Sequence, residues 1–315
     1  MAMTRRRLGV AGPVVSAVSL GSWRTFERME RADAVAVMVA AREAGITFLD
    51  DARYDDESGT APLPTGWSEV VFGEVFRAAG WDRDAVVVAN KLWWEFWPRQ
   101  DAAAELAASL RRLGLDRVDL IYAERRPAGM TVADVVREVS GLLQRGSSVH
   151  WGLLNWSAAD TAEAVATAGR LGVAAPVATQ LPYSAALRSV VEDREMTGVL
   201  SDTGVSVVAS ATLAGGLLTG KYADPAAAGR MAGKLEDPRA RAVLAGVPAF
   251  LALAADLGVA PAALAVGYAL ADPRTGSVLL GATAPAQIEQ NVAAVPLDDA
   301  TRDRVRACFP ERPGR

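Results

Sequence analysis

Short apolar runs alternate with longer amphipathic stretches from one end of the chain to the other. The runs are rich in Val, Ile and Leu with few polar interruptions, a pattern typical of strands that are buried on both faces. They predict eight strands: Val15–Leu20, Ile46–Asp50, Val86–Lys91, Val118–Ala123, Trp151–Asn155, Val177–Gln180, Val205–Ser210 and Gly276–Gly281.

The longer stretches between these strands predict helices, and Thr131, Ser157 and Ser68 with its neighbour Glu69 are candidate caps for three of them. The expected helices are Arg31–Ala44, Ser68–Ala79, Ala102–Leu113, Val132–Gln144, Ala158–Leu171, Ser189–Asp202, Pro261–Ala271 and Pro285–Val295. Alternation of strands and helices favours a parallel sheet. Eight such units favour a closed (β/α)8 TIM barrel over an open sheet of about five or six strands.

No linker, charge run or sequence repeat divides the chain, so residues 1–315 are expected to form one domain. The longest irregular stretches are 55–67 and 213–237, the second of which is broken by Gly-Gly and Asp-Pro pairs. Loops of that length inside a compact domain are usually functional.

The composition narrows the possible chemistry. Hydrophobic residues make up 51% of the chain, which indicates a globular protein, and a net charge of −4 gives a nucleic-acid partner no electrostatic support. The single cysteine, Cys308, excludes an internal disulfide and a cysteine-based zinc site. The single histidine, His150, excludes a multi-histidine metal centre and is expected to be structural. The chemistry must therefore use acids, amines, hydroxyls or an organic cofactor.

The chain lacks the usual marks of export or membrane insertion. Its basic start leads into a segment broken by Gly and Pro, and no window reaches about 18 uncharged apolar residues. We therefore expect neither a signal peptide nor a membrane span. A cytoplasmic location also fits the use of one cysteine.

Four polar residues fall at the carboxyl ends of three neighbouring predicted strands, where parallel barrels bind their ligands. They are Asp50 and Tyr54 after one strand, Lys91 at the end of the next, and Glu124 after the third. A tyrosine, with an ordinary pKa near 10, donates a proton well only if its acidity is raised, and a nearby ammonium does this. We therefore predict that Tyr54 is an acid, Lys91 its tuning partner and Asp50 the partner of Lys91. The alternative is a buried Lys–Asp pair with only a structural role.

Six segments carry a resemblance to a known family, in the family's own order. They are GITFLDDARY (45–54) with SEVVFG (68–73), VANK (88–91), LDRVDLIY (115–122), WGLLNWS (151–157), LAGGLLTGKY (213–222) and GATAPAQIEQN (281–291). Over nearly its whole length the chain resembles the aldo-keto reductases. The resemblance implies that Asp50, Tyr54 and Lys91 are catalytic and that Arg5–Val14 forms a small N-terminal β-hairpin closing the barrel bottom.

The resemblance also implies a nicotinamide cofactor, NADPH in this family, although the sequence does not select it over NADH. Asn155 and Gln180 match residues that hydrogen-bond the nicotinamide carboxamide, and Gly215, Leu217 and Lys221 fit a loop that cradles the pyrophosphate. The remaining candidate cofactor contacts are Ser210, Leu213, Gly281, Thr283, Gln287 and Asn291. No Gly-x-Gly-x-x-Gly follows a strand, so a Rossmann site is not indicated.

Several positions depart from the family pattern. Glu124 stands where the family usually has histidine, which resembles the steroid 5β-reductase branch, whose members reduce a conjugated C=C bond. A neutral Glu124 would donate a hydrogen bond to substrate, whereas a Glu124 paired with Arg125 or Arg126 would be a bystander. Tyr54 lies four residues after Asp50 rather than five, and Tyr122 is the fallback acid.

The cofactor positions also depart from the pattern. Leu154 replaces a serine beside Asn155, and Ser210 replaces the aromatic residue that stacks on the nicotinamide. Gly281, Ala282 and Gln287 replace residues that often bind the 2′-phosphate.

A cluster of aromatic residues follows Lys91. Trp93, Trp94 and Trp97, together with Trp23, are expected to line a pocket for a flat, largely apolar small molecule. Alternatively, some of them only pack the loop onto the barrel or form an oligomer contact. The sequence leaves the oligomeric state open.

These features predict an oxidoreductase that transfers hydride to a carbonyl or to an activated C=C or C=N bond, with Tyr54 as proton donor. The Ala/Arg/Val/Gly-rich composition also suggests a high-GC bacterial source and a role in secondary metabolism. A rival hypothesis is a non-catalytic regulator that binds the cofactor, similar to the potassium-channel β-subunits that share this fold.

Overall fold

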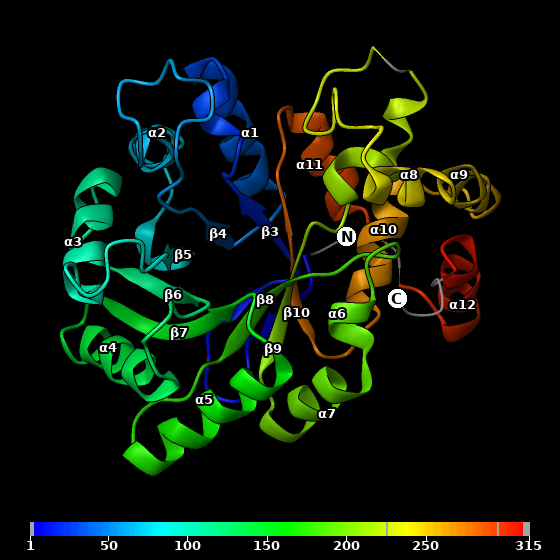
Figure 1. The fold of residues 1–315 in the computed structure, drawn as a ribbon. Helices are drawn as coiled ribbons and strands as arrows, with labels where there is room; N and C mark the ends of the chain where they lie inside the picture. Colours follow the sequence, from blue (N-terminus) through cyan, green and yellow to red (C-terminus); the bar gives the residue numbers. More distant parts are fainter. Residues whose placement is uncertain (1–2, 225, 295, 311–315) are drawn as a thin grey trace.

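The computed structural model describes residues 3–224, 226–294 and 296–310 (Figure 1). Its strands are β1 (Arg5–Arg7), β2 (Val14–Ser16), β3 (Val18–Gly21), β4 (Phe48–Asp50), β5 (Val87–Leu92), β6 (Val118–Glu124), β7 (Ser148–Leu154), β8 (Ala178–Pro182), β9 (Ser206–Ser210) and β10 (Thr275–Leu280). Strands β3 to β10 pair in parallel with their chain neighbours, and β10 pairs with β3, so the sheet is closed. The predicted (β/α)8 TIM barrel is therefore confirmed.

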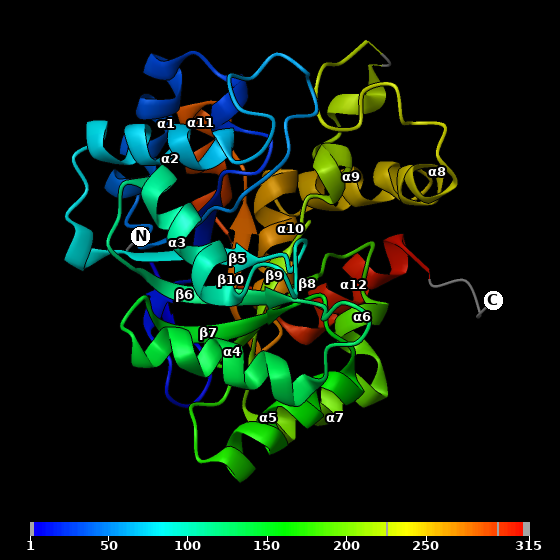
Figure 2. The ribbon, with the colours of Figure 1, turned by 60° about the vertical axis from the view of Figure 1, so that its left-hand side comes forward.

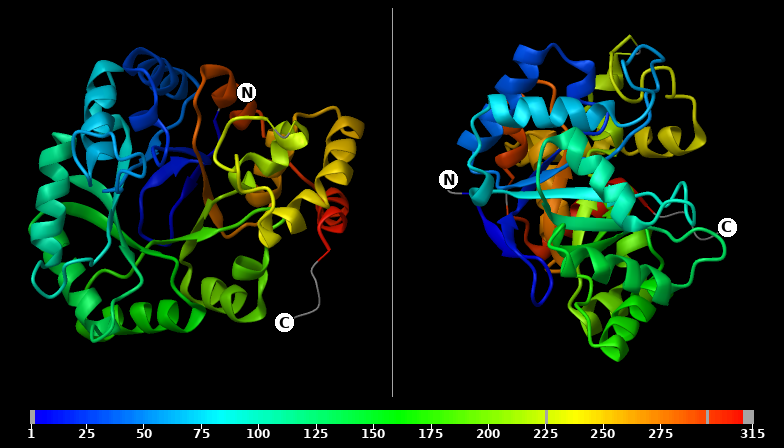
Figure 3. Two further views of the ribbon diagram at one scale, coloured as in Figure 1. Left: turned by 45° about the horizontal axis from the view of Figure 1, so that its top comes forward. Right: turned by 90° about the vertical axis from the view of Figure 1, so that its left-hand side faces the viewer.

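The helices surround the strands as a ring in the left view of Figure 3. The α-helices are α1 (Arg31–Glu43), α2 (Trp67–Ala78), α3 (Ala102–Leu113), α4 (Val132–Gln144), α5 (Ala158–Leu171), α6 (Ser189–Glu192), α7 (Arg194–Thr203), α8 (Pro238–Leu244), α9 (Val247–Asp256), α10 (Pro261–Leu270), α11 (Pro285–Val292) and α12 (Asp299–Cys308). Four short 3-10 helices complete the set: η1 (Phe26–Arg28), η2 (Arg83–Ala85), η3 (Ala214–Thr219) and η4 (Lys221–Ala223).

The predicted helices are present, with two kinds of difference. The helix expected over 189–202 is divided into α6 and α7, because Asp193 leaves the helical conformation and caps α7 by accepting from the Met196 N–H. Helices α8, α9 and α12 were not predicted. In α12 only Val305 is fully buried, so its apolar face is too short to give a clear helical period. The last residue of the predicted helix 285–295 lies outside the described residues.

Ser68 is not the cap that the sequence suggested. Helix α2 begins at Trp67, after Gly66. Ser68 therefore lies inside the helix, where its hydroxyl donates to the Ala52 carbonyl at 2.8 Å and accepts from the Tyr54 N–H at 3.3 Å. This serine fastens the start of α2 to the loop that carries Tyr54. The expected caps Thr131 and Ser157 are confirmed.

The barrel interior is filled from below by the N-terminal hairpin of β1 and β2. Leu8 and Val15 are fully buried there, in one apolar cluster with Phe48 and Tyr122. Gly152 of β7 makes room for the Tyr122 ring, since a Cβ at this position would lie 2.8 Å from it. Side chains thus close the bottom and leave the carboxyl ends of the strands as the open end.

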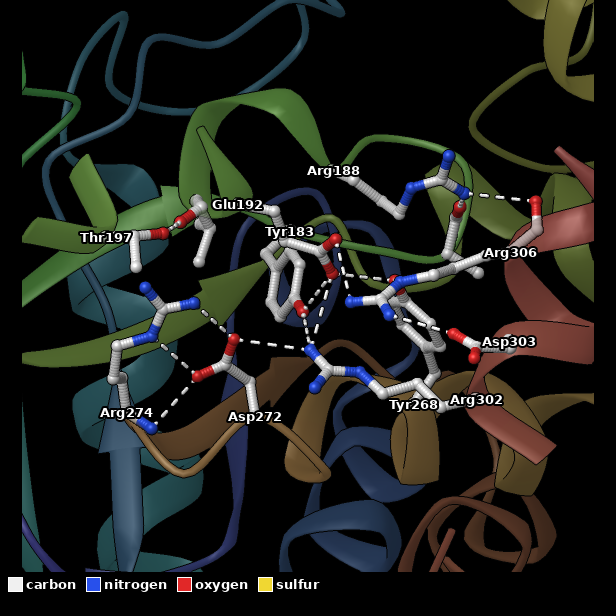
Figure 4. Close-up of polar contacts among 12 residues, drawn as sticks. Tyr183, Arg188, Glu192, Thr197, Tyr268, Asp272, Arg274, Arg302, Asp303 and Arg306 are labelled. Carbon is white, nitrogen blue, oxygen red and sulfur yellow. Dashed lines mark hydrogen bonds and ion pairs between the residues drawn. The ribbon is translucent and has the colours of Figure 1, made fainter. Parts of the chain in front are cut away.

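A polar network fastens α12 to the barrel (Figure 4). Glu192 of α6 accepts from the hydroxyls of Tyr183 and Tyr268, at 2.7 Å each, and pairs with Arg306 at 3.1 Å. Arg302 also donates to Tyr183, at 3.0 Å. Arg302 and Arg306 therefore dock α12 on the half-buried carboxylate of Glu192, and Arg302 also pairs with the buried Asp272 at 3.3 Å.

One helical stretch, Pro238–Asp256, has the length and mean hydropathy of a membrane-crossing helix. It is made of α8 and α9, which lie alongside α10 in Figure 2. Core helices of other proteins pass the same test, so this is weak support for a span.

Candidate active site

Three of the predicted catalytic residues meet at the open end of the barrel. The Lys91 ammonium forms an ion pair with Asp50 Oδ1, and it donates a hydrogen bond to the Tyr54 hydroxyl at 3.2 Å. The Asp50 and Lys91 side chains are each 3% exposed. The β4–α2 loop, although one residue shorter than the family pattern, therefore keeps the Tyr54 phenol beside the amine.

Burial changes the electrostatics that the sequence predicted for this trio. Burial raises the pKa of Tyr54 above its ordinary value, and the Lys91 ammonium, which acts to lower it, does not outweigh that effect. Burial also acts to lower the pKa of Lys91, but Asp50 and Tyr54 outweigh it, so the pKa of Lys91 is raised. The expectation that Lys91 makes Tyr54 acidic in the resting site is wrong. Tyr54 is a protonated phenol beside a firmly charged ammonium.

Residues of α2 form hydrogen bonds with the segments that carry Tyr54 and Lys91. Ser68 holds the Tyr54 N–H, as described above, and Glu69 accepts from the Asn90 side chain at 3.0 Å and pairs with Arg112. Asn90 precedes Lys91, and its side-chain oxygen accepts from the Lys91 N–H at 2.8 Å. The SEVVFG segment thus positions the acid and the strand that bears the amine.

Gln180 and Asn155 both contact acidic residues at the strand ends. The Gln180 amide donates to Asp50 Oδ2 at 3.0 Å, and the Asn155 amide donates to Glu124 Oε2 at 3.3 Å. Glu124 also lies 3.5 Å from the Arg125 guanidinium. The hypothesis that Glu124 is a bystander named Arg125 or Arg126 as its partner. The partner is Arg125, because Arg126 pairs with Asp160.

Tyr122, the fallback acid, is fully buried in the barrel interior below the site. Burial raises its pKa well above the ordinary value, and the nearby Asp50 carboxylate adds to the effect. Its location in the apolar cluster makes Tyr122 a core residue, which leaves Tyr54 as the phenol at the barrel mouth.

The four candidate pocket tryptophans have different locations. Trp23 and Trp93 flank Tyr54, with ring centroids 6.1 Å and 6.0 Å from its ring. Trp94 is only 2% exposed and belongs to the hydrophobic core, so its expected place in the pocket is wrong: it packs the loop onto the barrel. Trp97 is partly buried against the same core.

A cavity of about 150 Å³ opens beside Tyr54, and the sequence analysis did not anticipate its lining. The wall is formed by the β4–α2 loop, by the start of α2 and by η1. Its charged residues are Glu27, Arg28, Asp55, Asp56 and Glu57. Asp55, Asp56 and Glu57 come from 55–67, one of the two irregular stretches, and its length was the only sequence indication that this loop lines a site. Glu27 and Arg28 come from η1.

The η3–η4 loop fits the expected phosphate cradle. Gly215 and Gly216 have φ values of 69° and 93°, and a Cβ on Gly215 would lie 2.9 Å from Met231. Only glycine combines this backbone with such close packing, and the Gly216 N–H closes the turn by donating to the Leu213 carbonyl at 2.9 Å. Lys221 adds a cation beside the loop, while Leu217 is buried and Leu213 and Ser210 are partly buried.

The candidates near the C-terminus cluster before and within α11. The Gln287 side chain accepts from the Thr283 N–H at 2.8 Å, and Asn291 is buried on the same helix. Gly281 lies against Thr25, since a Cβ there would be 3.2 Å from the threonine hydroxyl. These residues lie at the end of β10, next to the turn that carries Trp23.

Arg230 is a residue of the mouth that the sequence analysis missed. It belongs to the long 213–237 stretch, and its guanidinium donates to the Trp23 carbonyl at 2.7 Å and lies 4.5 Å from the Trp23 ring centre. Only the length of that stretch indicated a functional segment. Arg230 brings a second cation, after Lys221, to the same end of the barrel.

Non-glycine residues with positive φ are confined to this end among the described residues. They are Arg24, Trp94, Asn155, Ala211 and Ala214, each within a few positions of a strand's carboxyl end. Left-handed backbone is costly for such residues and persists where surrounding structure holds it, as at ligand sites.

The comparison with known proteins agrees with this geometry. A sequence model of the Aldo/keto reductase family matches residues 17–309, and the chain belongs to that family. A relative from Oryza sativa subsp. japonica is 31% identical over 99% of this chain and 98% of its own length. One from Arabidopsis thaliana is 29% identical over 93% of this chain and 91% of its own length. Both are named "Probable voltage-gated potassium channel subunit beta".

Proposed function

We propose that the protein is a cytoplasmic NAD(P)H-dependent oxidoreductase. It reduces a carbonyl group, or an activated C=C or C=N bond, in a largely apolar small molecule. The observation that carries this proposal is the Lys91 ammonium held between the Asp50 carboxylate and the Tyr54 hydroxyl, in a buried site beside a cavity.

The side chains of the site have distinct tasks in such a reaction. Tyr54 holds the proton that the reduced substrate takes up, and its raised pKa keeps that proton in place at neutral pH. When the proton leaves, Lys91 stabilises the phenolate at hydrogen-bond distance. Asp50 keeps Lys91 charged and Gln180 fixes Asp50, so the ammonium is oriented before the reaction.

The nicotinamide cofactor, when bound, supplies the hydride. The residues present fit it: Gly215 and Gly216 lack side chains that would keep a pyrophosphate from the main chain, and Lys221 and Arg230 offer positive charge. Asn155 and Gln180 carry amides suited to the nicotinamide carboxamide. Further contacts are assigned to Ser210, Leu213, Leu217, Gly281, Thr283, Gln287 and Asn291. We propose NADPH as the preferred form because two cations lie near this loop.

A second candidate is a cofactor-binding regulator without turnover. The names of the relatives favour it, because both relatives are named as channel subunits. The ion pair of Glu124 with Arg125 also favours it, since a paired carboxylate is a poor hydrogen-bond donor to a substrate.

Cofactor titration followed by a turnover assay separates these candidates. Tryptophan-fluorescence quenching by NADPH and by NADH measures binding. The loss of reduced-nicotinamide absorbance is then followed with an enone, its saturated ketone and a cyclic imine. Turnover with any of them supports the reductase. Tight NADPH binding with no turnover across the panel supports the regulator and contradicts the reductase.

Glu124 is expected to set the choice between enone and ketone. In Glu124→His the ratio of kcat/KM for the ketone to that for the enone should rise at least about tenfold, which corresponds to 1.4 kcal/mol of differential transition-state binding. Glu163→His, on the outer helix α5, is the control. An unchanged ratio in Glu124→His removes Glu124 from the mechanism.

A further inference from the structure

Asp51 is a second carboxyl group in the site, next to Asp50 and fully buried. Its N–H donates to the Ala89 carbonyl at 3.1 Å, and its own carbonyl accepts from the Lys91 ammonium at 3.5 Å. Its carboxyl oxygen Oδ1 contacts the Ser22 hydroxyl, whereas Oδ2 has no hydrogen-bond partner within the described part of the chain. The side chain is therefore fixed between two strand ends with one oxygen unused.

Among the described residues, the cations nearest to Asp51 are paired with other carboxylates. Lys91 is paired with Asp50, and the nearby Glu69 is paired with Arg112. The titratable groups that face Asp51 are Asp50, Tyr54, Glu69 and Lys91. Burial raises the pKa of Asp51 well above its ordinary value, and repulsion by Glu69 adds to this. An ionised Asp51 would be a buried, uncompensated charge, so the neutral acid is the resting form.

The contact with Ser22 connects this acid to the wall of the site. The Ser22 N–H donates to the Asp50 carbonyl at 3.0 Å, and the Ser22 carbonyl accepts from the Thr25 N–H at 2.9 Å. Between them lie Trp23, which flanks the Tyr54 ring, and Arg24, whose φ is +54°. A non-glycine residue with a positive φ keeps this unfavourable backbone conformation only where the surrounding structure holds it. Ser22 is the point at which this turn is bound to β4.

Building on the proposed function, we propose that Asp51, as a neutral acid, is a positioning residue: through Ser22 it holds the Trp23 turn against Tyr54. The effect of Asp51 is on the placement of substrate beside Tyr54, and hence on KM. Proton transfer itself belongs to Tyr54 and Lys91. Ionisation of Asp51 would place a second negative charge beside Asp50, in a site without water to solvate it.

An infrared difference spectrum tests the neutral acid without turnover. Wild type minus Asp51→Asn at pH 7 should contain the C=O band of a protonated carboxylic acid. Asp55→Asn, an exposed neighbour, should show only loss of a carboxylate band. A carboxylate band in place of the acid band in the Asp51 difference spectrum overturns the proposal. This readout stands whether or not the protein proves to be a reductase.

Hydrogen exchange tests the link to the turn. In Ser22→Ala the amide of Thr25 should exchange faster than in wild type, because the anchor of the turn is removed. The control is Ser19→Ala, which removes another buried hydroxyl on β3, one that donates to the Val278 carbonyl. With any substrate found, KM should rise in Ser22→Ala far more than kcat falls. Equal Thr25 exchange in the two serine variants overturns the proposal, and so does a loss in kcat with KM unchanged.

Discussion

At the scale of single residues, the site is defined by three side chains, Asp50, Tyr54 and Lys91, that meet in a buried place. The sequence predicted that Asp50, Tyr54 and Lys91 would meet, because strand ends of a parallel barrel converge. It predicted the opposite sign for the shift of the Tyr54 pKa, because it weighed the charge of Lys91 without the burial of the folded site. Tyr54 therefore keeps its proton in the resting site. Lys91 contributes mainly once negative charge develops on the phenol oxygen.

Asp51 should make the stability of the protein depend on pH. Its pKa is raised from the ordinary value of 3.8, so above that value the folded state binds a proton that the unfolded chain has released. The free energy of unfolding therefore falls as pH rises above about 4. In urea titrations from pH 5 to pH 8, Asp51→Asn should lose less stability than wild type, while Asp55→Asn should follow wild type. Parallel curves for wild type and Asp51→Asn would contradict the assignment.

At the scale of elements, strands and helices were more predictable than loops. The strands of the barrel are continuous apolar runs, and the predicted positions match β4 to β10 closely. The predicted strand Val15–Leu20 instead spans the end of β2 and most of β3, because the chain passes from the hairpin to the barrel within this apolar run. The roles of Trp94 and Arg230 could not be predicted. Which loop side chains turn inward depends on tertiary contacts and on left-handed residues, which leave little periodic pattern in the sequence.

The different locations of Trp94 and Trp23 predict stability losses of different size when each side chain is truncated. Trp94→Ala should lower the free energy of unfolding by about 3–5 kcal/mol, because it leaves a cavity in the core. Trp23→Ala should lower it by about 1 kcal/mol or less, since this ring is 43% exposed and held mainly by Arg24 and Arg230. Chemical denaturation of both variants checks this, and equal losses would contradict the placement of Trp94.

At the scale of the whole molecule, α12 is joined to the barrel by charge as well as by apolar packing. The network of Figure 4 connects it through Glu192 to Tyr183. The backbone of Tyr183 lies between strand ends of the site, because its N–H donates to the Ser210 carbonyl and its carbonyl accepts from Thr212. This network could not be predicted, because its members lie far apart along the chain.

Glu192 should therefore stabilise the protein at neutral pH and less in acid. Burial acts to raise the pKa of Glu192, but hydrogen bonds from Tyr268 and Tyr183 and the charges of Arg306 and Arg302 lower it below 4.5. A depressed folded-state pKa gives stability that is present above the unfolded value and is lost as pH falls through the folded value.

Glu192→Gln tests this contribution. At pH 7 the variant should be less stable than wild type by about 1–3 kcal/mol, and the difference should shrink below pH 4.5. The matched control is Glu195→Gln on α7, where the side chain is exposed. Thermal unfolding across this pH range provides the measurement. A difference that stays constant with pH would contradict the role of the Glu192 charge.

The central claim is that Tyr54, beside Lys91, supplies the proton during reduction. It is tested most directly by a single-turnover reaction with NADPH deuterated at the transferable position, comparing wild type with Tyr54→Phe. Wild type should form deuterated product. Tyr54→Phe should bind the cofactor with similar affinity but react at least about 100-fold more slowly, the usual contribution of a general acid. Equal rates in the two proteins, with cofactor bound in both, would contradict the account.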